Sequence, residues 1–148
     1  MDNPFISEFL YLEKLPKING WGVFTSKSIK KNTIIEISPV TFYPQKLLNV
    51  SIYMSIAEGI KPHEVGIDQY SINWPVDNDS YQKSAIMFGY LSMYNHSDIP
   101  NARFYSDFSD RLMGIITTDD IPENSQVTVS YGSDWFDKKK DYLSQFNF

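Results

Sequence analysis

The sequence of 148 residues contains no cysteine and only two histidines, His63 and His96. Without cysteine, the chain cannot form disulfides, bind zinc through thiolates or use a cysteine nucleophile. Two histidines also argue against a histidine-rich metal site. We therefore expect a protein that binds no metal.

Long hydrophobic runs are absent as well. No apolar run approaches the ~20 residues that a membrane-spanning helix requires. The N-terminus, Met1-Asp2-Asn3, has an acidic residue where a secretion signal carries positive charge. The sequence therefore predicts a soluble intracellular protein without a membrane anchor, and it does not distinguish cytoplasm from nucleus.

Positive charge is scarce in one half of the chain. Residues 1–75 hold seven acidic and seven Lys or Arg residues, whereas residues 76–148 hold eleven and six, which accounts for the whole net charge of −5. The one basic cluster, at 138–140, is typical of a solvated helix face. We expect no direct nucleic-acid binding, because that function requires a basic surface. An acidic half can instead attract a cationic partner.

What the chain does contain is typical of one globular domain spanning residues 1–148. Hydrophobic residues make up 42% of it and aromatic residues 16%. Aromatic residues favour strands, so a β-rich core is the simpler interpretation and an aromatic-lined pocket the alternative.

The hydrophobic pattern predicts a mainly β (α+β) fold without the βαβ alternation of a nucleotide-binding sheet. A hairpin is expected across residues 107–110, and residues 84–93 fit either a helix or a strand. Helices are expected at 45–58 and at 134–145, the second capped by Ser133. Strands are expected at 8–13, 21–25, 33–43, 70–74, 102–106, 111–117 and 127–130.

Three short motifs stand out along the chain. The first is Gly20-Trp21-Gly22, the second is Asn95-His96-Ser97 followed by Pro100-Asn101, and the third is the strand 127–130 that leads to Tyr131-Gly132. Taken singly, each has a structural interpretation: a tight turn, a polar loop and a core tyrosine.

Taken together and in this order, the three motifs resemble those of the SET-domain family of protein-lysine methyltransferases. The resemblance covers residues 8–136, with 44–83 as an inserted variable region, and is strongest to the small SET-only proteins of bacteria and viruses. It implies a β-clip fold of several small sheets with a few short helices. It also implies a C-terminal pseudoknot, in which the Asn95-His96 segment threads beneath the final strand.

The resemblance further implies S-adenosylmethionine (AdoMet) as cofactor and a lysine of a basic protein, such as a histone, as substrate. Tyr131 is the implied catalytic residue. The implied cofactor-binding residues are Gly20, Trp21, Gly22, Asn95, His96 and Trp135. The implied substrate-channel residues are Tyr94, Phe104, Val129 and Phe136.

The chain departs from the family pattern at three places. Asp98 stands where the family has a cysteine, Ser92 where many members have an arginine, and Asn124-Ser125 where an acidic pair is common. A second copy of the chain can supply a missing channel wall, so a homodimer is compatible with the sequence. The alternative function is a catalytically weak SET-fold module that binds a peptide or AdoMet without turnover.

Overall fold

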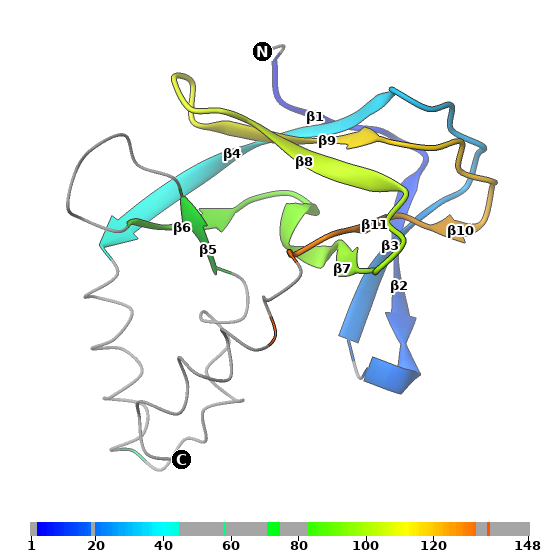
Figure 1. The fold of residues 1–148 in the computed structure, drawn as a ribbon, viewed down its shortest axis with the longest axis horizontal. Coiled ribbons are helices and arrows are strands. Elements are labelled where there is room, and N and C mark those ends of the chain that lie inside the picture. Colours follow the sequence, from blue (N-terminus) through cyan, green and yellow to red (C-terminus); the bar gives the residue numbers. More distant parts are fainter. Residues whose placement is uncertain are drawn as a thin grey trace. The chain divides into compact units, whose positions relative to one another are not determined.

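The computed structural model describes residues 3–18, 20–44, 58, 71–74, 83–132 and 136. The chain divides into two compact units (Figure 1). The first comprises Met1–Val40 and Met87–Tyr131, and the second comprises Thr41–Ile86 and Gly132–Phe148. All the predicted site residues except Trp135 and Phe136 belong to the first unit.

The described residues form strands in several small sheets with two short 3-10 helices, which confirms the mainly β prediction. The helices are η1 (Pro16–Ile18) and η3 (Leu91–Met93). The strands are β1 (Phe5–Ile6), β2 (Leu10–Leu15), β3 (Gly20–Thr25), β4 (Ile34–Pro44), β5 (Ser71–Trp74), β6 (Lys83–Met87), β7 (Asn95–His96), β8 (Ala102–Asp107), β9 (Leu112–Thr117), β10 (Ser125–Gln126) and β11 (Thr128–Val129).

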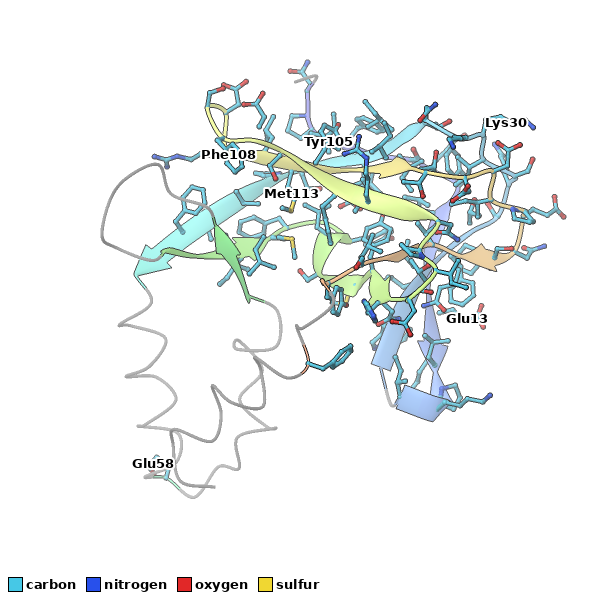
Figure 2. All side chains as sticks on the ribbon, in the orientation of Figure 1. Glu13, Lys30, Glu58, Tyr105, Phe108 and Met113 are labelled. Carbon is cyan, nitrogen blue, oxygen red and sulfur yellow. The ribbon has the colours of Figure 1, made fainter. Side chains whose placement is uncertain are left out.

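The largest sheet is built on β4, which has β9 on one side and β6 on the other. Strands β8 and β9 form the predicted hairpin, with Ala102 opposite Thr117 and Asp107 opposite Leu112. Tyr105 of β8 lies opposite Gly114 of β9, and its ring occupies the place that a Cβ atom at Gly114 would take. Figure 2 labels Tyr105 and Met113 on this pair of strands.

Most of the core of the first unit consists of β-branched and other aliphatic side chains from the strands and from the segments between them. Such residues suit a pleated, half-buried surface, which is why the pattern identified these strands. Fully or almost fully buried members include Val23, Ile35, Ile37, Ile115, Ile121, Val127 and Val129.

A second sheet has the order β10-β3-β2, and it presents the first motif. Strand β2 pairs with β3 along its whole length, from Leu10 opposite Thr25 to Leu15 opposite Gly20. On the other edge of β3, β10 pairs only with Phe24 and Thr25. The edge at residues 20–22 is therefore not covered by β10.

The third sheet joins the second and third motifs, which lie far apart in the sequence. Strands β7 and β11 run parallel, with Asn95 opposite Thr128 and His96 opposite Val129 (Figure 1). Asn101 fastens the pair from the side: its Nδ2 donates to the Gln126 carbonyl at 2.9 Å and its Oδ1 accepts from the Thr128 N–H at 2.9 Å. This pairing brings the Asn-His segment against the final strand, as the family resemblance implies.

Segment 84–93 forms both predicted alternatives in succession. Strand β6 ends at Met87 and η3 begins at Leu91, with Gly89 between them at a φ of 66°. A positive φ interrupts a strand and suits glycine, so the change of structure falls at this residue.

Strand β5 confirms the strand predicted at 70–74. Other expectations concern residues outside the described part of the chain. The predicted helices at 45–58 and 134–145 lie outside the described residues apart from Glu58 and Phe136, and Trp135 does too. Within the described residues, no helix has the length and apolar character needed to cross a membrane.

Candidate active site

Tyr131 is held at both its backbone and its phenol group. Its hydroxyl donates a hydrogen bond to the Tyr94 carbonyl at 2.7 Å, and its N–H donates to Nδ1 of His96 at 3.1 Å. The rings of His96 and Tyr131 lie 5.4 Å apart at an angle of 43°. The pairing of β7 with β11 thus orients the tyrosine that follows β11.

The hydrogen bonds of His96 define which ring nitrogen carries its proton. Nδ1 accepts from the Tyr131 N–H, so in the neutral ring the proton sits on Nε2. Nε2 lies 3.1 Å from Oδ1 of Asp98 and donates to it. Asp98, which replaces the family's cysteine, therefore favours the tautomer that accepts from Tyr131. The sequence did not predict this role.

The first and second motifs meet through Asn95. Its Nδ2 donates to the Trp21 carbonyl at 3.0 Å. Gly22 allows this approach, because a Cβ atom there would lie 2.6 Å from Gln126 Nε2 and 3.0 Å from Asn95 Nδ2. Any side chain at Gly22 would push Asn95 or Gln126 away, so the glycine is required for close packing of the motifs.

The edge of β3 offers backbone groups that suit an amino-acid ligand. In an antiparallel strand, the N–H and C=O of one residue point to the same side. The Trp21 carbonyl points to Asn95, so its N–H faces that edge too. The Trp21 side chain is 50% exposed. A backbone N–H at a strand edge can donate to the carboxylate of an amino-acid ligand.

A buried carboxylate, that of Glu36, bonds to the side chain of Tyr94. Glu36 of β4 is fully buried, and its oxygens accept from the hydroxyl of Tyr94 at 2.8 Å, the hydroxyl of Ser38 at 2.9 Å and the N–H of Tyr90 at 2.8 Å. Burial raises the pKa of the Glu36 carboxyl, and the hydrogen bonds from Tyr94 and Ser38 oppose that rise. Burial and the neighbouring carboxylate also raise the pKa of Tyr94 well above its ordinary value. The phenol therefore stays protonated and donates.

This carboxylate makes stability depend on pH in a definite direction. A raised pKa means that the folded state binds the Glu36 proton more tightly than the unfolded state does. In the unfolded state, the pKa of a glutamate is about 4.3. The unfolding free energy of the wild type, relative to Glu36→Gln, should fall as pH rises from about 4.3 through the folded pKa, and then level off. Urea unfolding of both proteins across this range measures the difference, and a pH-independent difference would contradict the prediction.

The structure brings eight of the eleven predicted site residues together in the first unit. Gly20, Trp21 and Gly22 lie on β3, which meets Asn95 through the Trp21 carbonyl. Tyr94, Asn95, His96, Val129 and Tyr131 lie on or beside the β7–β11 pair. The ring of Tyr94 is buried, and its hydroxyl bonds to Glu36. The contact of Tyr94 with Tyr131 is therefore made by the Tyr94 backbone carbonyl.

The remaining predicted residues lie elsewhere. Phe104 is in β8, opposite Ile115. Phe136 is exposed and belongs to the second unit, together with Trp135. Among the described residues, no three acidic or histidine side chains are grouped so as to hold a metal ion.

Comparison with known proteins decides the family. The family sequence model of the SET domain matches residues 20–132, which include all three motifs. The chain belongs to the SET-domain family. It is thus a protein-lysine N-methyltransferase by family, and SET methyltransferases in general use AdoMet.

Two relatives support this membership over most of the chain. The SET domain is 26% identical, over 129 residues, to a histone-lysine N-methyltransferase of Schizosaccharomyces pombe specific for lysine 37 of histone H3; the match covers 86% of the chain and 78% of that protein. It is also similar to the crystal structure of a Plasmodium falciparum protein assigned as a histone methyltransferase. That match has a TM-score of 0.57 and 28% identity, and it covers 88% of this chain and 99% of the other.

Proposed function

We propose that this SET domain transfers a methyl group from AdoMet to a lysine side chain of a basic protein, with histones as the substrate class. The observation that carries the proposal is the double anchoring of Tyr131, whose hydroxyl and N–H are bound to Tyr94 and His96. A tyrosine held in this way suits the positioning of two reactants.

The hydrogen bond of the Tyr131 hydroxyl determines what its oxygen can do. The hydroxyl proton is directed at the Tyr94 carbonyl, so the oxygen keeps its lone pairs for accepting a hydrogen bond. A lysine amine that donates to this oxygen is held in one orientation, which favours in-line attack. The tyrosine ring also attracts cations through its π face. Bound AdoMet supplies an electrophilic methyl group on a sulfonium.

The other residues take supporting roles in this proposal. Asn95 and the backbone of Trp21 hold the cofactor, and the flanking Gly20 and Gly22, which pair with β2, leave room for it. His96 supports both cofactor and tyrosine. Phe104 of β8 and the fully buried Val129 stay predictions as residues of the lysine channel. Trp135 as an adenine cover, Phe136 as a channel residue and the homodimer stay predictions.

Asn95 provides a test of the cofactor site. Asn95→Asp keeps the size of the side chain but removes the N–H that donates to the Trp21 carbonyl, and it places two oxygens in repulsion. We expect AdoMet affinity to fall by roughly tenfold, equivalent to about 1.4 kcal/mol. Titration calorimetry with AdoMet measures this, and equal affinities for wild type and variant would remove Asn95 from the cofactor site.

The charge distribution supports a basic substrate, as do the two relatives named as histone methyltransferases. Eleven acidic and six basic residues in 76–148 give the half that holds Tyr131 a net charge of −5. Salt screens attraction between exposed charges, so the KM for a lysine-rich histone-tail peptide should rise with sodium chloride while kcat changes little. Steady-state kinetics at increasing salt checks this, and a KM that ignores salt would argue against charge-guided binding.

A further inference from the structure

Glu36 is a buried carboxylate in an otherwise apolar stretch of β4. It is the one fully buried acidic residue in the described part of the chain, and no described cation lies within salt-bridge distance of it. Burying a charge without a cation is costly unless several donors surround it. Here the donors are two hydroxyls and the backbone of Tyr90 and Leu91.

All the donors except the Ser38 hydroxyl come from one short segment, residues 89–94, which wraps around the carboxylate. Gly89 begins it at a φ of 66°, and a Cβ atom there would overlap Oε1 of Glu36 and the hydroxyl of Ser38. Tyr90 then donates its N–H, η3 follows, and Tyr94 closes the segment with its hydroxyl on Oε2. The carboxylate thus anchors both ends of the turn that immediately precedes Asn95.

The same segment orients the proposed catalytic tyrosine. Tyr94 is 1% exposed, and its ring is held by Glu36 while its carbonyl accepts from the Tyr131 hydroxyl at 2.7 Å. A shift of the Tyr94 ring would move this carbonyl, and with it the direction of the Tyr131 oxygen. One hydrogen bond therefore separates the carboxylate from Tyr94, and one more separates Tyr94 from Tyr131.

We propose that Glu36 is a positioning residue for methyl transfer, which sets the Tyr94 carbonyl and through it the Tyr131 hydroxyl. This inference rests on the proposed function, since it assumes that Tyr131 contacts the reacting amine. Glu36 itself touches neither substrate nor cofactor in this role.

The test compares Glu36→Gln, Tyr94→Phe and Ser38→Ala as folded full-length proteins. In Glu36→Gln, the amide either points an N–H group at the Tyr90 N–H, or it donates to the Tyr94 oxygen and so reverses the direction of that hydrogen bond. Tyr94→Phe removes only the hydroxyl that Glu36 orients. Ser38→Ala also removes one hydroxyl from the carboxylate, but from Oε1, which Tyr94 does not use.

We expect kcat at saturating AdoMet and histone peptide to fall about 10- to 100-fold in Glu36→Gln and in Tyr94→Phe, because small displacements of a positioning group have effects of this size. AdoMet affinity should change less than about threefold in both. Ser38→Ala should lower thermal stability but retain kcat to within about threefold. A merely structural Glu36 would instead make stability fall in all three variants without this split in kcat.

Tyr131→Phe, measured in parallel, separates the two proposals. If Tyr131→Phe loses activity while folded Glu36→Gln and Tyr94→Phe keep wild-type kcat, the positioning role is wrong and the proposed function stands. If Tyr131→Phe keeps its activity, the assignment of Tyr131 fails first. If Glu36→Gln does not fold, Tyr94→Phe decides the question, because its ring still fills the buried site.

Discussion

Tyr131→Phe is expected to lower kcat by about 10²- to 10⁴-fold, the range for loss of a group that handles the reacting proton or its hydrogen bond. The variant removes the oxygen that accepts from the substrate amine and donates to the Tyr94 carbonyl. The ring stays, and so does the backbone hydrogen bond to His96. AdoMet affinity should therefore change little. Single-turnover methyl transfer and calorimetry with AdoMet separate the two effects.

Tyr11→Phe is the matched control, because it removes the same atom from a tyrosine of the β2–β3 hairpin. The Tyr11 ring stacks on Phe24 with centroids 5.9 Å apart, so its packing does not depend on the hydroxyl. This control should keep wild-type kcat. Unchanged turnover in Tyr131→Phe would show that the tyrosine after β11 is not part of the reaction.

Gly89→Ala should destabilise the protein by about 3–5 kcal/mol, the cost of disrupting the partners of a buried charge. Two effects combine at this position. A φ of 66° is strained for alanine, and the new methyl group would overlap the Glu36 carboxylate and the Ser38 hydroxyl. Since domains are stable by only about 5–15 kcal/mol, urea unfolding should show a large shift of the midpoint.

Gly20→Ala provides the comparison for this variant. The nearest atoms to a Cβ atom at Gly20 would be in the side chain of Ile18 at 3.5 Å and its carbonyl oxygen at 3.7 Å, which is ordinary contact. Its unfolding free energy should stay within about 1 kcal/mol of wild type. If Gly89→Ala also stayed within about 1 kcal/mol of wild type, the segment around Glu36 would adapt easily to a side chain. That result would also weaken the case for Glu36 as a positioning residue.

The parts of the fold that the sequence predicted correctly are those with a local signal. The hairpin of β8 and β9 has a strand-forming segment on each side of a polar turn, where Oδ1 of Asp107 accepts from the N–H and hydroxyl of Ser109. The three motifs were visible because their residues lie next to one another. Their meeting in space was implied by family resemblance, since parallel pairing of β7 with β11 leaves no short-range trace.

Glu36 and Asp98 were missed as site residues for different reasons. Glu36 is a single carboxylate between isoleucines, and that contrast in an apolar strand was the available signal. Its partner hydroxyl at Tyr94 comes from 58 positions away, so no local pattern could identify it. Asp98 is a departure from the family motif, and only the ring orientation of His96 shows what the carboxylate does there.

The most direct test of the central claim is incubation of the purified protein with radiolabelled AdoMet and histones, followed by mass spectrometry of the labelled peptide. We predict methylation of a lysine side chain that is lost in Tyr131→Phe and retained in Tyr11→Phe. AdoMet binding by calorimetry without any transfer to histones or other basic proteins would contradict this prediction and favour a SET-fold binding module instead.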